Sequence, residues 1–556
     1  MYYPLVRPFA RLAGGALLAF VVIFWRLGAP SFWDPDEAHY AETTRELVNS
    51  GDWLAPYYNE QPFFDKPVFF HWLQALPMGV GGPTEAAARL VPALAALALA
   101  VITWWVGSQL AGSAVGVLAA LLLIANPGTF GLARYAILDS LMTALLFGGV
   151  SLLAVAALRG RPRLQYAGYV LIGLATCVKG PLAVVLCGLT FVVAILLSAE
   201  VRRLLLSLKW IRGLLIVAAI AAPWFVLMLR RFDGAFVDGY FLSENIRLFA
   251  QPVYGNQPGW WFYLAIIGTG FLPWTWIIAG RLSDQIRRAM QFRRSPDALD
   301  VMLWSWVLAI VGFFSFSQFK LDHYVYPAAP ALCLLCARGW TELQADYGGA
   351  STWGTRLGVR LVGPTLVVGG LAIAVAAIQL LALPSAFLIV PGLVIALGAA
   401  ASIRYLRADR FPSLPSLGLA ALGVVYVGAL VWVIPQIERE KVIPDVARWV
   451  AAQPPVERVA TFRLNRWNPA YRFYVDRHVE MLESDEDARR FFSDASPYYC
   501  VMTEPLFDAL RRAGVPLKVV YRRNGLWATS GRMLWRQREQ LTTFVVVAHE
   551  NQIVQP

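Results

Sequence analysis

Apolar segments long enough to cross a lipid bilayer recur along the chain from the N-terminus to about residue 434. A hydrocarbon core about 30 Å thick requires a helix of about 20 apolar residues. The pattern predicts about thirteen spans, at 9–28, 86–106, 112–126, 135–158, 166–178, 181–198, 210–230, 260–280, 300–317, 323–340, 358–380, 384–403 and 414–434. Because no small-residue cleavage site follows the first segment, we interpret it as a retained helix.

The last 120 or so residues have a different pattern. Runs of β-branched and aromatic residues at 457–462, 498–502 and 517–521 predict strands, and helices are predicted between them at 441–452 and 505–513. We therefore expect a transmembrane domain over 1–436 and a small α/β domain over 437–556. No glycine-rich phosphate loop occurs in the second domain, which favours a lid or scaffold without chemistry of its own.

The basic residues predict the orientation of the spans. If the N-terminus is cytoplasmic, every long inner connection is rich in arginine and lysine, as the positive-inside rule requires. These residues are Arg7, Arg11, Arg159, Arg161, Arg163, Arg202, Arg203, Lys209, Arg281, Arg287, Arg288, Arg293, Arg294, Arg404, Arg407 and Arg410. An odd number of spans then places the C-terminal domain outside the cell. The same distribution accounts for the net charge of +12, so no nucleic-acid partner is expected.

Composition narrows the class of protein further. Hydrophobic residues make up 58% of the chain and charged residues only 15%, which is typical of an integral membrane protein. Of the five cysteines, four lie in apolar segments, so no disulfide framework is predicted. Cys333 and Cys336 are interpreted as packing residues rather than as a metal site. The sequence shows no internal repeat, so it does not support a transporter built from inverted repeats.

The first outer loop, at about 31–85, is too long for a simple connection. Its segment 37–50 predicts a helix at the membrane interface, with one apolar and one charged face. Ala38, Ala41, Leu47 and Val48 are expected to face the membrane surface, and Glu37, Arg45 and Glu46 to face water.

Ionisable residues outside the inner loops gather at the outer face. Besides Asp36, Glu37, Asp65 and Lys66 of the first loop, four more outer connections supply Arg134, Asp139, Lys179, Glu244, Arg247, Lys320, Asp322 and His323. A charge at the end of a span is costly unless it is solvated or paired, so Asp139 and Lys179 are site candidates by default. Five loops that deliver acids and bases to one face indicate an active site rather than a conduction path.

Several of these residues have a structural alternative. Asp36 and Glu37 point about 100° apart on a helix, so one can act on a substrate while the other stabilises the helix N-terminus. Lys66 either forms an ion pair with Asp65 or binds a phosphate. Lys179 either acts in the site or extends to the membrane interface.

Transfer of a group from a lipid-anchored phosphate donor fits this arrangement. The phosphate of such a donor lies at headgroup depth, where lysine and arginine can neutralise it as a leaving group. A carboxylate opposite the reacting carbon of the sugar can orient or deprotonate the attacking oxygen. Outside the cell no nucleotide sugars are expected, so the activated bond must arrive on a lipid.

The motifs DPDEAHYAE, SGDWLAPYYNEQPFFDKP, RYAILDSLMT, VKGP and FKLDHYVYPAAPAL resemble the bacterial branch of the protein O-mannosyltransferase superfamily of GT-C glycosyltransferases. Within that branch the similarity is greatest to the lipid A aminoarabinose transferases, and it covers about residues 20–340. The resemblance implies a GT-C fold in a bacterial inner membrane, with the site and the C-terminal domain in the periplasm. It also implies transfer of 4-amino-4-deoxy-L-arabinose from undecaprenyl phosphate to a lipid A phosphate.

Carried over by residue, the resemblance implies that Asp36 is the catalytic carboxylate, that Asp139 supports the acceptor or the first loop, and that Lys66 contacts the donor phosphate. Lys320 and Tyr324 would belong to the donor-side loop. The complete candidate set is Asp36, Glu37 and Asp139 for catalysis, Lys66, Lys179, Arg247 and Lys320 for the donor phosphate, and Asp65, Arg134, Glu244 and Tyr324 elsewhere in the substrate site.

Two positions depart from the family pattern. Asp65 stands where aminoarabinose transferases have glutamate, and Asn245 stands where they have histidine. Since some members hold a metal through that glutamate and histidine, we predict no metal ligands here, with a divalent ion as the open alternative. The same departures leave the identity of the sugar open. The acceptor is open as well, because a hydroxyl of a protein, glycan or lipid would serve if Asp36 removed its proton. A lipid or sugar transporter and a non-catalytic assembly protein are the alternatives of another class.

Overall fold

The computed structural model describes residues 6–251, 258–292, 297–345, 352–379, 383–406, 414–464, 469–494, 496–527 and 541–549. By its internal contacts the chain divides into two compact units. The first comprises residues 1–27, 64–70 and 89–431, and the second comprises residues 28–63, 71–88 and 432–556. Of the inner-loop arginines named above, Arg293, Arg294, Arg407 and Arg410 lie outside the described residues.

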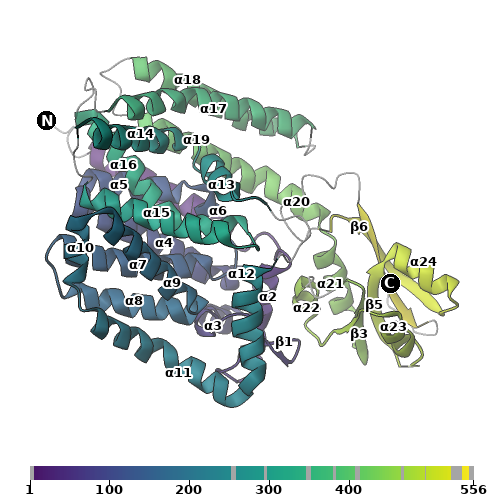
Figure 1. The fold of residues 1–556 in the computed structure, drawn as a ribbon. Helices are drawn as coiled ribbons and strands as arrows, with labels where there is room; N and C mark the ends of the chain where they lie inside the picture. The colour runs from purple at the N-terminus through teal and green to yellow at the C-terminus, as the bar shows by residue number, and fades with distance from the viewer. Residues whose placement is uncertain are drawn as a thin grey trace. The chain divides into compact units, whose positions relative to one another are not determined.

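The first unit is helical (Figure 1). Among the described residues, seven helices are long and apolar enough to cross a membrane, or eight if one bent pair is a single span. The chain is therefore a multi-span membrane protein. Its elements are α1 (Val6–Ala19), η1 (Phe20–Phe24), α4 (Glu85–Ala111), α5 (Ser113–Ile124), α6 (Pro127–Leu132), α7 (Asp139–Leu158), α8 (Leu164–Lys179), α9 (Leu182–Leu197), α10 (Ala199–Leu206), α11 (Trp210–Phe236), η2 (Val237–Arg247), α12 (Leu248–Ala250), α13 (Phe262–Gly270), α14 (Thr275–Phe292), α15 (Ala298–Phe316), η3 (Asp322–Ala328), α16 (Ala329–Ala345), α17 (Trp353–Gln379), η5 (Ser385–Leu388), α18 (Ile389–Leu406), α19 (Leu414–Gly428) and η7 (Ala429–Val433).

Each span predicted from the sequence contains a helix, but two differences stand out. The segment 260–280 is broken into α13 and α14, which bend by 115° around a short connection that contains Pro273. Arg281, expected in an inner loop, instead lies inside α14 and is buried. Its guanidinium pairs with Asp300 at 2.9 Å and with Glu342 at 2.7 Å, and these two carboxylates make its burial tolerable. The number of thirteen spans stays a prediction.

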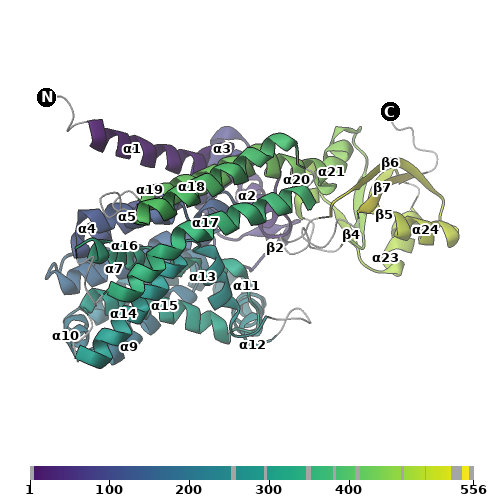
Figure 2. The ribbon, with the colours of Figure 1, turned by 90° about the horizontal axis from the view of Figure 1, so that it is seen from above.

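Small residues let the helices of this unit approach closely. Gly280 of α14 lies against the backbone of Gly354 in α17, and a Cβ at either position would collide with the other helix. On the other face of α17, Gly363 meets Gly398 and Ser402 of α18, and both views show α17 and α18 side by side (Figures 1 and 2). Glycine at such contacts is the usual device of membrane helix packing, since lipid supplies no hydrophobic driving force.

The second unit combines the first outer loop with the C-terminal residues. The loop segments contribute α2 (Asp36–Ser50), the hairpin β1 (Tyr57–Tyr58) and β2 (Gln61–Pro62), and most of α3 (Phe69–Gly81). The C-terminal residues form α20 (Ile434–Glu440), α21 (Ile443–Ala452), β3 (Arg458–Phe462), α22 (Pro469–Val475), β4 (Glu480–Leu482), α23 (Asp485–Phe492), β5 (Tyr498–Thr503), α24 (Glu504–Arg512), β6 (Leu517–Gly525) and β7 (Thr542–His549).

The C-terminal residues form the α/β fold predicted from the sequence. The sheet order is β4-β3-β5-β7-β6, with β3 parallel to both β4 and β5, and β7 antiparallel to β5 and β6. All three predicted strands and both predicted helices are present. The short β4 and the last strand β7 were not predicted. A buried apolar cluster that includes Phe462, Phe491 and Val545 forms the core of this part.

Candidate functional site

The acidic pair of the first loop stands at the start of α2. Asp36 is the first residue of this helix, where a negative charge is favoured by the exposed backbone N–H groups. Glu37 is buried, and its carboxylate accepts a hydrogen bond from the backbone N–H of Trp33 at 3.0 Å. Asp36 is only partly buried. The two adjacent carboxylates therefore have different surroundings, as their helical separation requires.

The expected orientation of α2 is wrong. Glu37, Arg45 and Glu46 do not face water; all three are less than a tenth exposed. Ala38 and Leu47 are also buried inside the protein. The local sequence pattern predicted that these charges face water. The acidic and basic residues that α2 meets lie more than 400 residues further along the chain, so the local pattern could not reveal them.

Lys66, a predicted donor-phosphate ligand, lies in the first unit between two carboxylates. Its Nζ is 2.5 Å from Oδ1 of Asp65 and 3.5 Å from Oε2 of Glu244 in η2. Burial alone would lower the pKa of Lys66, but the two carboxylates raise it above its ordinary value. Lys66 is therefore a permanent cation.

Asp139 and Lys179 form a second charged cluster in the same unit. Lys179, at the end of α8, donates to Oδ1 of Asp139 at 2.6 Å, and both side chains are about nine-tenths buried. On its other side, Asp139 has its Oδ2 3.9 Å from Nε2 of His323, and the ammonium of Lys179 lies 5.0 Å from the ring centre of Tyr324. Pairing of this kind lowers the free-energy cost of burying a charge at the end of a span.

The two clusters interact. Lys66 is close enough to Asp139 to act on it electrostatically, so residues from the segment 64–70, α7, α8, η2 and η3 contribute to one charged region. Within the first unit the structure thus brings together Asp65, Lys66, Asp139, Lys179, Glu244 and Tyr324.

Three other candidates have their own partners. Lys320 donates to the carbonyl of Ser317 beside η3. Arg247 is exposed, with Nη1 3.3 Å from the hydroxyl of Ser243. Arg134 donates to the carbonyls of Val22 and Trp25, where it holds the end of the first helix. The action of these residues on a substrate stays a prediction.

The residues around Glu244 do not fit a divalent metal. The ammonium of Lys66 lies between the carboxylates of Asp65 and Glu244, and the amide of Asn245 donates to the backbone carbonyl of Tyr240 at 2.7 Å. No group of three or more histidine, cysteine, aspartate or glutamate side chains arranged to hold a metal occurs among the described residues. A metal here would compete with a cation that the protein itself supplies.

Sequence reasoning missed two features of these sites. Tyr240 is fully buried beside Lys66, and its hydroxyl packs on Gly180, directly after Lys179. A lone tyrosine in an apolar run gives no signal. Arg472, which lies in the C-terminal domain and pairs with two glutamates of α2, was equally invisible, because a contact over 400 residues leaves no local pattern.

Comparison with protein families and sequences supports the resemblance drawn from the motifs. A family model described as dolichyl-phosphate-mannose-protein mannosyltransferase matches residues 65–227. Two curated relatives bear the name undecaprenyl phosphate-α-4-amino-4-deoxy-L-arabinose arabinosyl transferase. The one from Edwardsiella ictaluri is 29% identical over 350 residues, which are 61% of this chain and 62% of the relative. The one from Aeromonas hydrophila is 30% identical over 338 residues, or 60% of each chain. The matched region thus spans about three fifths of these relatives.

Comparison with solved structures shows the fold. The crystal structure of ArnT from Cupriavidus metallidurans bound to undecaprenyl phosphate matches with a TM-score of 0.75 and 23% identity, covering 98% of this chain and 99% of that one. An oligosaccharyltransferase from Archaeoglobus fulgidus matches with a TM-score of 0.50 and 12% identity, covering 90% and 70%. Together with the family and sequence matches, these comparisons confirm the predicted GT-C fold and the resemblance to aminoarabinose transferases.

Proposed function

We propose that this chain is a glycosyltransferase that moves a sugar from a polyprenyl phosphate to an acceptor at the outer face of the membrane. The donor is undecaprenyl phosphate-linked 4-amino-4-deoxy-L-arabinose, and the acceptor is a phosphate of lipid A. The names of the curated relatives support the donor, and the ArnT structure with undecaprenyl phosphate supports the lipid carrier. The membrane is the bacterial inner membrane, and the charged clusters and the C-terminal domain face the periplasm.

The observation that carries this proposal is the charged region around Lys66 and Lys179. Both lysines lie beside carboxylates that keep them in place before a ligand arrives. A preorganised cation acts most strongly on a charge that develops in the transition state, and a departing phosphate gains negative charge as its bond to the sugar breaks. Two ammonium groups in a mostly buried region suit a lipid phosphate better than a freely soluble anion.

In the proposed reaction an acceptor oxygen attacks the anomeric carbon of the sugar. The bond from that carbon to the donor phosphate breaks, and its electron pair leaves with the polyprenyl phosphate, which Lys66 and Lys179 neutralise. A lipid A phosphate is already anionic and needs no general base, so Asp36 would orient the reactants and stabilise positive charge on the sugar. A single displacement of this kind inverts the configuration at the carbon.

A hydroxyl acceptor on a protein, glycan or lipid is the second candidate, since the matching family model is described as a protein mannosyltransferase. In that case Asp36 must also remove the hydroxyl proton. Mass spectrometry of lipid A and of envelope glycans from a deletion strain separates the two acceptors. Loss of a 4-amino-4-deoxy-L-arabinose substituent from lipid A is expected, whereas a change confined to glycans or glycoproteins would replace the first acceptor by the second.

Two substitutions test the roles of the residues. Asp36→Asn is expected to lower kcat by about 10²-fold or more with the donor KM little changed. Lys66→Met is expected to weaken binding of undecaprenyl phosphate by about tenfold or more, because it removes a charge-assisted contact. Both are measured on purified protein in nanodiscs, with Lys518→Met of the C-terminal sheet as an exposed control. Full transfer by Asp36→Asn would exclude it as the catalytic carboxylate.

A further inference from the structure

The helix α2, which carries Asp36, is bound to the C-terminal domain by buried ion pairs. Glu42 and Glu46 of α2 both pair with Arg472 of α22, at 3.1 Å and 3.3 Å. Glu42 also pairs with Arg45 at 2.6 Å, and Arg45 in turn donates to the carbonyl of Phe473 at 2.8 Å. All four charged side chains are a tenth exposed or less.

The pairs with Arg472 join residues more than 400 positions apart in the sequence. α2 ends at residue 50 and α22 begins at residue 469, yet their side chains meet without intervening solvent. The ring of Phe473 lies under the guanidinium of Arg45, 4.9 Å from ring centre to Cζ. A buried charge that loses one partner is left uncompensated in a poorly polarisable medium, so these residues hold α2 in one position relative to α22.

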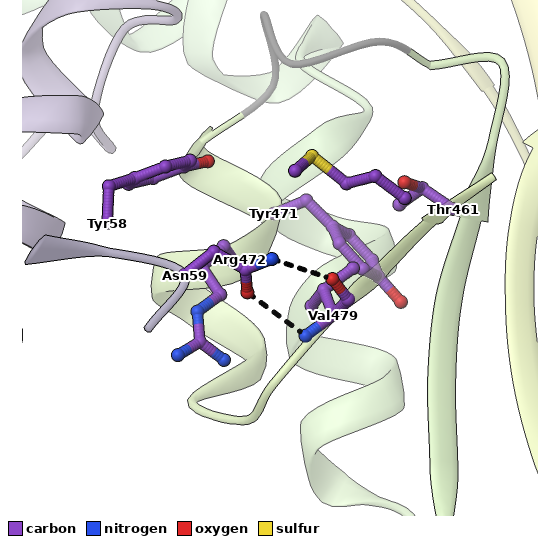
Figure 3. Close-up of a pocket in the computed structure, with 7 residues that line it drawn as sticks. Tyr58, Asn59, Thr461, Tyr471, Arg472 and Val479 are labelled. Atoms are coloured by element: carbon purple, nitrogen blue, oxygen red, sulfur yellow. Dashed lines mark hydrogen bonds between the residues drawn. The ribbon is translucent and has the colours of Figure 1, made fainter. Parts of the chain in front are cut away.

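The segments on both sides of α2 are also held by the C-terminal residues, through hydrogen bonds. Before the helix, Oδ1 of Asp34 accepts from the backbone N–H of Ala470 at 2.8 Å, and Lys441 donates to the carbonyl of Ser31 at 3.0 Å. After the helix, the amide of Asn59 makes two hydrogen bonds with the backbone of Val479, as Figure 3 shows. Arg472 lies beside this pair in the same view.

We propose that α22, through Arg472, sets the position of α2 and so of Asp36, which makes the C-terminal domain a fixed part of the catalytic apparatus. Arg472 is then a positioning residue, since it acts through Glu42 and Glu46 and not on the substrate. This inference rests on the proposed function. A lid would have to break the buried pairs each time it opened, so the contacts favour a scaffold.

The test uses the full chain in nanodiscs and two matched substitutions. Arg472→Met keeps most of the side-chain length and removes the guanidinium. Arg458→Met is the control, because Arg458 pairs with Glu480 at 2.6 Å and with Asp494 at 3.1 Å inside the C-terminal sheet. Amide hydrogen exchange of residues 36–50 reports on the anchoring of α2, and kcat and donor KM report on its effect.

Arg472→Met is expected to speed exchange in 36–50 by about tenfold or more, since local opening follows the loss of buried contacts. It is expected to lower kcat by about 10- to 100-fold with the donor KM within about threefold, because a displacement of 1 Å in a catalytic group is costly. Arg458→Met is expected to change neither quantity. Unchanged exchange in 36–50, or unchanged kcat despite faster exchange, would overturn the proposal.

A second variant separates positioning from general stability. Glu42→Gln combined with Arg472→Met removes both charges of the Glu42–Arg472 pair. Glu46 keeps two backbone N–H donors and Arg45 keeps Asp476, so the double variant is expected to recover the yield and melting temperature of the protein without recovering kcat. Recovery of kcat along with stability would overturn the positioning role. If the unaltered protein transfers the sugar from the donor and the Arg472→Met variant does so with the same kcat, only this inference fails. If the unaltered protein transfers no sugar from any polyprenyl phosphate, both it and the proposed function fail.

Discussion

Individual charged residues in this chain are defined by partners distant in sequence. The sequence singled out Lys66, Asp139 and Lys179 because a charge at a span end or in a long outer loop is costly without a partner, and the structure gives each of them one. Their action on a substrate stays a prediction. The sequence named the adjacent Asp65 as a possible partner of Lys66, but it could not predict the distant partners: Lys179 pairs with Asp139, 40 residues away, and Lys66 also pairs with Glu244. Asp34 shows the same limit. It lies buried and accepts a hydrogen bond from the backbone N–H of Ala470, 436 residues further along the chain.

Asp34 gives a prediction on pH. Burial raises the pKa of this carboxyl from 3.8 to about 8. Between these values the folded state holds a proton that the unfolded chain releases, so the stabilisation from neutral Asp34 is complete below about pH 4 and is lost as the pH rises through about 8. The melting temperature of the protein in nanodiscs should therefore fall from pH 5 to pH 8.

Asp34→Asn keeps an oxygen that can accept from Ala470 but cannot ionise. It should reduce the fall in melting temperature between pH 5 and pH 8 by about 2–4 °C or more. Asp485→Asn, at an exposed aspartate of the same domain, should leave the wild-type dependence unchanged. Parallel profiles for Asp34→Asn and the unaltered protein would show that Asp34 ionises freely in the folded state.

At the level of elements, apolar periodicity located every long helix, and strand propensity located three strands of the C-terminal sheet. Apolar periodicity did not show the break between α13 and α14, because the residues on both sides of Pro273 are equally apolar. It also assigned the wrong environment to α2. A helix with charges on one face is usually solvated there. Here the distant Arg472, which pairs with Glu42 and Glu46, adds to local partners such as Arg45 and makes burial of the two carboxylates feasible.

Helix packing in the first unit gives a second prediction. Gly280→Val places a branched side chain against the Gly354 carbonyl of α17, so α14 and α17 must separate. We expect a loss of about 1–3 kcal/mol or more, as for other overpacked contacts. Gly312→Val is the matched control, because a Cβ at this helical position meets no atom within 4 Å. Melting temperature and monodispersity on gel filtration measure the difference, and equal behaviour of the two variants would contradict the packing argument.

For the whole molecule, the recurring apolar segments were sufficient to predict a multi-span protein, and the strand-like and helix-like runs near the C-terminus predicted the α/β part. The positions of the arginines predict only the orientation. The predicted orientation has a direct test. Alkaline phosphatase fused after Ser50 and after Gln453 should be active, and green fluorescent protein at the same points should not fluoresce. Fusions after Arg163 should show the reverse. Opposite results at Ser50 and Gln453 would separate Asp36 from the C-terminal domain by a membrane and end the proposal for Arg472.

Because the chain passes several times between its two units, segments exchanged with a relative must be chosen together, and substitutions in these segments should be correlated during evolution. The backbone passes from one unit to the other after residues 27, 63, 70, 88 and 431. A hybrid made by exchanging only the last 125 residues with a relative would therefore place the relative's residue at position 472 against the native Glu42 and Glu46. Productive recombination must transplant segments 28–63 and 71–88 together with the tail, and natural substitutions on the two sides should arise as compensating pairs.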